Sequence, residues 1–271
     1  MRSLLAVLLL LGSLSSFAQI PVVREDGVLN GASFALSGQP GHAVAPGSLV
    51  SIFGDQFAAG SEEASSIPLP ISLQGVRVTF NDKPAPVLFV SANQINAQLP
   101  WDVASFTPSG TTQVVTVVVT RGGLPSGPMN VILQQYSPGV FAFSNRYANA
   151  VNATDSTVAQ PEGSIPGLIT RPVSVGEAIV IYANGLGPID TPVPTGDLGA
   201  VPIIRTTMTP TVLIGGVEAQ VLFSGLAPQF VGVNQLNVVV PVNSPVCDAV
   251  PLQISTGGIT TSDAITIAVR R

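Results

Sequence analysis

Few residues of this chain could carry acid–base or metal chemistry. Its 271 residues include one histidine, His42, and one cysteine, Cys247. A Ser-His-Asp hydrolase would have to use His42 as its base, and the Gly-x-Ser-x-Gly turn of many hydrolases does not occur in the sequence. One histidine and one cysteine do not make a usual zinc ligand set. We therefore interpret His42 as a solvated loop residue and predict no catalytic residue, metal site or cofactor.

Carboxylates are dispersed along the expected loops, and a glycosidase needs two of them facing each other across a cleft. The sequence leaves such a pair open, although loop carboxylates of β-sandwiches are more often solvated. The Asp-x-Asp-x-Asp pattern of a calcium loop does not occur, and a surface calcium ion at a domain edge is left open. The carboxylates concerned are Glu62, Glu63, Asp155, Glu162, Asp190 and Asp197.

Trp101 is the only tryptophan and the one candidate ligand contact. If it is exposed, its ring could stack on a sugar. If it is buried, it would pack at the end of a sandwich or against a second domain, with Phe141, Phe143 and Tyr147 as partners. We favour the buried interpretation, because a sugar platform usually has aromatic neighbours and aromatic residues are only 6% of the chain.

Charge excludes several classes of partner. Charged residues are only 9% of the chain, the net charge is −5, and Lys and Arg are scattered. Binding to nucleic acid or to an anionic membrane surface needs a basic footprint, so both are disfavoured. The single cysteine allows no intramolecular disulfide, and we interpret Cys247 as a buried or half-buried small residue rather than a reactive thiol.

The elements that would position these residues are short β-strands. Low charge argues against surface helices, whereas 27 Gly and 24 Pro between β-branched runs indicate many turns and strands. The predicted strands lie at 49–53, 76–80, 87–90, 95–99, 114–119 and 129–133, and then at 178–182, 211–214, 220–223, 236–240, 250–255 and 264–269.

One phrase occurs twice: the run 93–100, NQINAQLP, returns at 234–241 as NQLNVVVP. In the first copy Ile95, Ala97 and Leu99 share one strand face, and the amides between them share the other, where they could bond loop backbone. The second copy keeps the apolar alternation but replaces Gln98 by Val239. We therefore interpret the phrase as a core strand and not as an active site.

Shorter phrases recur in the same order around both copies. They predict an all-β fold of two tandem immunoglobulin-like antiparallel β-sandwiches, residues 19–143 and 144–271, with no flexible linker between them. The matching pairs are residues 28–30 with 150–152, 47–53 with 176–182, 85–89 with 219–223, and 122–124 with 257–259.

Residues 1–18 have the features of a secretory signal peptide. Met1-Arg2 is basic, Leu4–Leu11 is apolar, and Ser16 and Ala18 are small residues before a predicted cleavage at Gln19. No later apolar segment is long enough to span a membrane, which takes about 20 residues. We predict a secreted protein, periplasmic or extracellular, without a membrane span.

The repeated phrases resemble the IPT/TIG class of immunoglobulin-like domains. The resemblance lies in residues 45–54 (APGSLVSIFG), 76–81 (VRVTFN), 84–88 (PAPVL) and 95–100 (INAQLP). More narrowly, the phrases at 93–101, 137–141, 181–188 and 221–228 resemble the Solibacter-type C-terminal domain of secreted acidobacterial proteins. The resemblance covers residues 28 to 270 and implies a bacterial Ig-like fold but no particular activity.

Two functions remain. The preferred one is a non-catalytic exported module, not an enzyme, that binds a protein or a cell-surface polymer such as a polysaccharide through loops or sheet edges. The alternative is a carbohydrate-binding or weakly carbohydrate-active protein that uses Trp101 and loop carboxylates. The sequence leaves the oligomeric state open.

Overall fold

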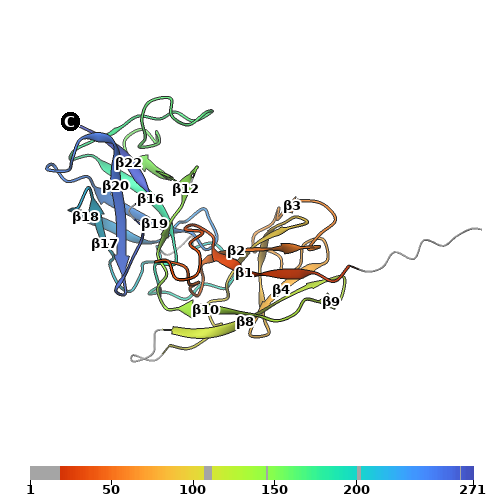
Figure 1. Ribbon diagram of the computed structural model, residues 1–271. Coiled ribbons are helices and arrows are strands. Elements are labelled where there is room, and N and C mark those ends of the chain that lie inside the picture. Colours follow the sequence, from red (N-terminus) through yellow and green to blue (C-terminus); the bar gives the residue numbers. More distant parts are fainter. Residues whose placement is uncertain (1–18, 107–111, 145, 200–202, 263) are drawn as a thin grey trace, which may run out of the picture.

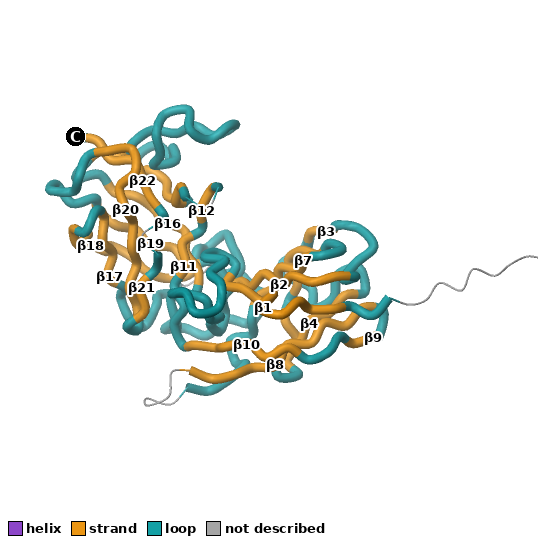
Figure 2. The backbone as a smooth tube through the Cα atoms, viewed as in Figure 1, coloured by secondary structure: helices purple, strands orange, loops and turns teal. Residues whose placement is uncertain are grey.

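The computed structural model describes residues 19–106, 112–144, 146–199, 203–262 and 264–271. The predicted signal peptide, residues 1–18, lies outside the described residues. The described chain consists of strands and loops without a helix (Figures 1 and 2), which confirms the predicted all-β fold class. Each of the predicted runs overlaps a strand. No helix of the described residues is long and apolar enough to cross a membrane.

The first half of the chain, whose core residues lie between Val23 and Leu133, folds into two facing sheets. One sheet has the order β1 (Val22–Asn30), β2 (Leu49–Asp55), β7 (Gln94–Gln98), β6 (Val87–Val90) and β3 (Glu62–Glu63). The other has the order β10 (Met129–Gln134), β8 (Thr112–Arg121), β4 (Val76–Phe80) and β5 (Lys83–Ala85), with β9 (Leu124–Pro125) beside β8.

The second half, whose core lies between Val140 and Val269, forms one continuous sheet. Its order is β11 (Gly139–Val140), β16 (Ala178–Asn184), β19 (Asn234–Val239), β18 (Val217–Leu226), β17 (Thr211–Ile214), β20 (Cys247–Thr256), β22 (Thr266–Arg270), β13 (Tyr147–Ala148) and β12 (Ala142–Phe143). Beside this path lie β14 (Ala150–Asn152), β15 (Val173–Ser174) and β21 (Ile259–Thr260). Most pairs are antiparallel, but β22 is parallel to β13 and β15.

A single proline accounts for part of the difference between the halves. In the first half the chain passes from β5 in one sheet to β6 in the other, and Pro86 lies at the break. Proline has no N–H to donate to a strand ladder. The predicted repeat aligns Pro86 with Gln220, and there β18 runs unbroken, pairing first with β17 and then with β19. The unbroken strand joins the two faces of the second half into one sheet.

The boundary at residues 143/144 stays a prediction. The short strands β11 and β12 precede it and pair with strands of the second half. Residues 137–141 therefore carry the chain directly from one half into the other. Figure 1 shows the two lobes lying side by side, with β11 and loops at their junction in Figure 2.

A buried hydrogen-bonded joint connects the halves. Its centre is Asn184, at the end of β16 and fully buried. The Asn184 Oδ1 accepts the Leu49 N–H at 2.9 Å, and its Nδ2 donates to the Leu49 carbonyl at 2.8 Å. The same Nδ2 donates to Asn30 Oδ1 at 2.9 Å. The carboxamide thus pairs with Leu49 as a neighbouring strand would pair with it.

Other polar contacts extend this joint. Gln98, only 1% exposed, donates to the Gly47 carbonyl at 2.9 Å and accepts the Gly196 N–H at 2.6 Å. The Ser137 N–H donates to the Gly185 carbonyl at 2.9 Å. Gly185 has a φ of +68°, and a Cβ there would lie 2.2 Å from the Ser137 carbonyl oxygen. These contacts fix both the distance and the rotation between the halves.

We expect Asn184→Ala to lower the free energy of unfolding by about 1–3 kcal/mol, because the Leu49 N–H would lose its acceptor while the Leu49 carbonyl would keep only the Gly31 N–H. Urea unfolding monitored by circular dichroism would measure the loss. Asn237→Ala is the control, since this half-buried amide oxygen accepts only from the Gln235 side chain. An unchanged midpoint for Asn184→Ala would show that the joint contributes nothing to stability.

Candidate functional site

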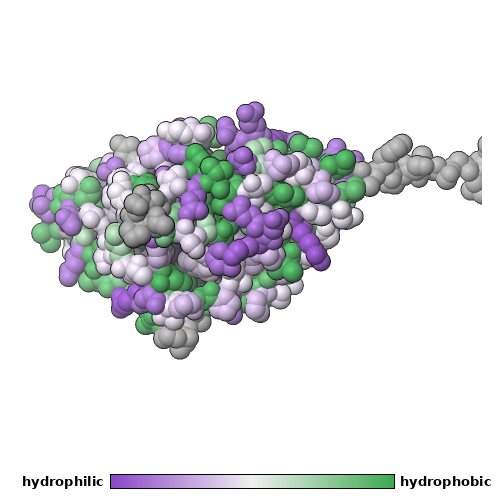
Figure 3. Space-filling model, turned by 90° about the horizontal axis from the view of Figure 1, so that it is seen from below, coloured by the Kyte–Doolittle hydropathy of each residue, from purple (hydrophilic) through white to green (hydrophobic). Residues whose placement is uncertain are grey.

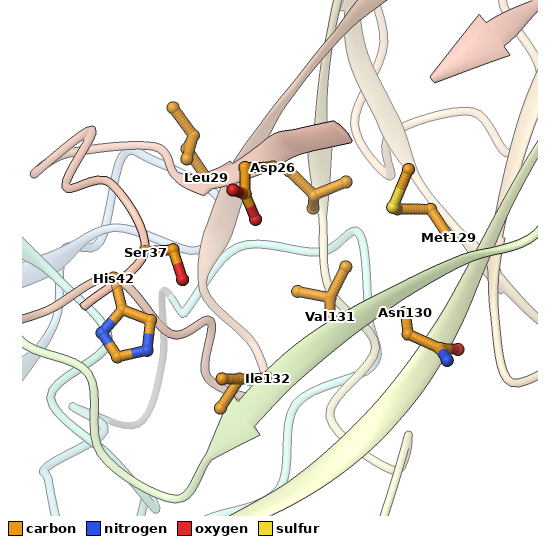
Figure 4. Close-up of a pocket in the computed structure, with 9 residues that line it drawn as sticks. Asp26, Leu29, Ser37, His42, Met129, Asn130, Val131 and Ile132 are labelled. Carbon is orange, nitrogen blue, oxygen red and sulfur yellow. The ribbon is translucent and has the colours of Figure 1, made fainter. Parts of the chain in front are cut away.

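The pocket beside His42 is lined by a serine, a histidine and an aspartate, the three residue types of a hydrolase triad. They are not arranged as a triad. Asp26, Ser37 and His42 all line it, between β1 and the edge strand β10 (Figure 4). The His42 Nδ1 lies 2.6 Å from the Gln39 carbonyl oxygen. The described residues include no hydrogen bond from His42 to Ser37 or Asp26. The cavity holds about 70 Å³, well below the roughly 300 Å³ of small ligand sites.

The best-organised carboxylates form an ion cluster around Arg171 in the second half. The Arg171 Nε lies 2.6 Å from Asp155 Oδ2, and its two terminal nitrogens lie 2.6 and 3.0 Å from the carboxylate of Glu177. Thr154 Oγ1 also donates to Glu177, and Thr157 donates to Asp155 through its N–H and hydroxyl. Together these contacts tie the long loop before β15 to the start of β16.

These bonds lower the pKa of both carboxyls to about 2. Arg171 is the main cause in each case, with further hydrogen bonds from Thr157 to Asp155 and from Thr154 to Glu177. The same contacts raise the pKa of Arg171. Both carboxyls are therefore ionised at neutral pH, whereas a general acid must keep its proton. Neither carboxyl has the raised pKa of a glycosidase general acid.

The remaining loop carboxylates lie apart. Glu62 and Glu63 are exposed on the edge strand β3. Asp190 Oδ1 accepts the Arg205 N–H at 3.1 Å, and Asp197 Oδ1 accepts the Leu198 N–H at 2.8 Å. Within the described ranges, no three His, Cys, Asp or Glu side chains come close enough together to hold a metal ion.

Trp101 lies at the junction of the two halves. Its ring covers Gly47, where a Cβ would lie 2.3 Å from three indole carbons, so only glycine leaves room for it. Its backbone N–H donates to Thr195 Oγ1 of the second half at 3.3 Å. The ring is half-buried, and its Nε1 is buried without a hydrogen-bond partner.

A cavity of about 310 Å³ opens beside this ring, lined by both halves. The aromatic residue that shares the cavity with Trp101 is Phe106, and not Phe141, Phe143 or Tyr147 as the sequence suggested. The other lining residues are Pro46, Ala104 and Gln135 of the first half and Gly187, Pro188, Ile189, Pro192 and Val193 of the second. Sequence reasoning missed the second set, because a proline-rich loop gives no sign of which distant residue it will contact.

Cys247 is exposed, so its interpretation as a buried or half-buried residue was wrong. It begins β20, and the register of β20 against β22 shifts between Cys247 and Val250. Val250 is fully buried. The strand therefore enters the core only after its first residues.

The ion pairs of Arg171 with Asp155 and Glu177 should make the stability of the protein depend on pH in the acid range. Both folded pKa values lie below those of free carboxyls, which are about 4, so the ion pairs stabilise the fold fully above about pH 4. This stabilisation is lost as the pH falls toward 2. We expect the urea midpoint to fall between pH 4 and 2, and to fall less in Arg171→Met.

The midpoint should be followed by circular dichroism at several pH values. Arg24→Met is the matched control, because the Arg24–Asp55 pair is exposed and contributes little. An identical pH dependence in wild type and Arg171→Met would contradict this account.

Comparisons with solved structures give only weak likenesses. The surface glycan-binding protein PbSGBP-B of Prevotella bryantii is 9% identical, with 90% of this chain and 41% of that chain covered and a TM-score of 0.28. The plexin A4 extracellular region is 12% identical, with 97% and 19% covered and a TM-score of 0.26. Domains 5–6 of the S-layer protein SbsC are 11% identical, with 89% and 95% covered and a TM-score of 0.22.

These TM-scores are too low to show a shared fold, and the chain spans less than half the length of the first two proteins. No curated protein sequence matches the chain. The comparison with protein families does give a match, to the IPT/TIG domain, over residues 39–137. This range holds β2 to β10 and most of the first hydrophobic core, but not Val23 and Val28 of β1. Residues 39–137 are therefore an IPT/TIG domain.

Proposed function

We propose that the chain is a non-catalytic exported module of the Solibacter-type C-terminal family, built as a tandem Ig-like repeat, that binds another protein or a cell-surface polymer. The observation that carries this proposal is the buried joint around Asn184 and Gln98. A joint of this kind holds the loops of both halves in one arrangement before a partner arrives. Preorganised surfaces bind more tightly, because less conformational entropy is lost on binding.

The distribution of apolar residues on the surface is more consistent with several small contact sites than with one large flat apolar interface. Apolar and polar residues are interspersed on the face seen in Figure 3. Exposed large hydrophobic residues such as Val22, Ile132 and Leu222 lie on three different strands, β1, β10 and β18. A large exposed apolar patch would mark a flat interface. Loops, sheet edges and the cavity at the junction are therefore the candidate contacts.

The second candidate is carbohydrate binding, favoured by the position of Trp101 in that cavity. Its wall is poorly suited to a sugar, because of the described residues that line it only Gln135 and the indole of Trp101 have a polar side-chain group. A pyranose buries several hydroxyl groups that each need a partner. Among the described loop carboxylates, Asp155 and Glu177 are held in ion pairs with Arg171. We therefore rank a protein partner above a glycan.

Two parallel binding assays discriminate between the candidates. We expect the purified chain to capture a protein from the cell envelope of its host by cross-linking, and to give no signal on a glycan array that depends on Trp101. A glycan signal lost in Trp101→Ala but kept in the surface control Leu222→Ala would favour the alternative. Glycoside hydrolysis by the purified chain would contradict the non-catalytic proposal directly.

Export is tested separately. The full chain expressed with residues 1–18 should be recovered outside the cytoplasm, and its mature form should begin at Gln19 when intact mass is measured. A cytoplasmic product that keeps Met1 would contradict export.

A further inference from the structure

The cavity beside Trp101 has walls that are almost wholly ring and aliphatic surface. Trp101 and Phe106 supply aromatic faces, and Pro46, Pro188 and Pro192 supply flat pyrrolidine rings. Its volume of about 310 Å³ lies at the lower end of the range for ligand sites. Both halves contribute to the wall, so the cavity depends on the joint that holds them together.

Among the described residues, none that lines this cavity carries a charge. The two nearest carboxylates in the sequence follow Trp101 and Ile189, and both are already engaged. Asp102 pairs with Lys83, and Asp190 accepts the Arg205 N–H. An occupant that carried a charge would lose its hydration without gaining a partner. The electrostatic match is therefore to an uncharged ligand.

The chain itself already packs a proline-rich segment against Trp101. The segment 188–195, PIDTPVPT, has prolines at three positions. Pro188 and Pro192 line the same cavity as Trp101, and Thr195 accepts its backbone N–H. The cavity thus adjoins a surface around Trp101 against which the proline-rich segment 188–195 already packs.

We infer that this cavity binds an uncharged, proline-rich segment of another polypeptide in the polyproline II conformation. The inference rests on the proposed function and names the partner's chemistry. Such segments dock in aromatic-lined grooves and lose little conformational entropy, since the free segment already has the bound shape. Gln135 lines the cavity, and its side-chain amide can donate to a ligand carbonyl. The ligand's proline rings pack on Trp101 and Phe106.

The single tryptophan reports on this site directly. Acetyl-decaproline-amide contains no chromophore near 295 nm excitation, so a saturable change in the emission of Trp101 measures its binding to the full chain. We expect Ile189→Asp to weaken this binding by about tenfold or more, because it places a charge on the apolar wall. Leu222→Asp, a charge at a position 51% exposed in the second half, is the matched control and should bind like wild type.

Circular dichroism and urea midpoints establish that both variants fold. Ala104→Arg is a second test variant, which places a large side chain in the cavity from the first half. Equal binding by wild type, Ile189→Asp and Ala104→Arg would overturn the site. Failure of decaproline and of an array of uncharged proline-rich peptides would overturn the ligand class. Capture of a protein partner that is insensitive to Ile189→Asp would then leave the proposed function standing without this inference. Glycan binding lost in Trp101→Ala would overturn this inference and favour the carbohydrate-binding alternative.

Discussion

The carboxamide of Asn184 is the contact on which the arrangement of this protein depends. It sits where β16 ends and satisfies both backbone groups of Leu49, at the start of β2. An N–H buried without a partner costs about 1–3 kcal/mol. The Leu49 N–H takes its acceptor from Asn184 in the second half, whereas the Leu49 carbonyl also accepts the Gly31 N–H of the first half. Two further side chains of the first half bond to the second half in the same way: Asn30 accepts from Asn184, and Gln98 accepts the Gly196 N–H. Hydrogen bonds are directional, so such a joint specifies one orientation where apolar contact alone would tolerate several.

Glycines make this close approach between the halves feasible. Trp101 covers Gly47, and the ring of Tyr136 lies between Gly187 and Gly257, where Cβ atoms would come within 2.3 Å of ring carbons. The contact of Trp101 with Gly47 lies within the first half, whereas the contacts of Tyr136 with Gly187 and Gly257 connect the first half to the second. The cavity beside Trp101 remains where this packing is incomplete. A site made in this way belongs to neither half alone.

The ion pairs of Arg171, by contrast, connect segments within the second half and do not join the two halves. Arg171, Asp155 and Glu177 tie down a loop of the second half, and their low carboxyl pKa values follow from that role. His42 is bonded to backbone rather than to a serine. Arg171, Asp155, Glu177 and His42 are thus engaged in structural contacts, whereas the described residues around the cavity beside Trp101 are apolar or aromatic apart from Gln135.

The sequence by itself determined the strands, their inner faces and the IPT/TIG domain. Alternation put Ile95, Ala97 and Leu99 in the core, because a strand turns successive side chains to opposite faces. Local pattern could not show that Gln98, expected on the outer face, would be buried, since its partners Gly47 and Gly196 are remote in sequence. The same holds for the neighbours of Trp101 and for the exposure of Cys247. The periodicity of one strand fixes which side a residue takes, whereas only the tertiary structure decides what covers that side.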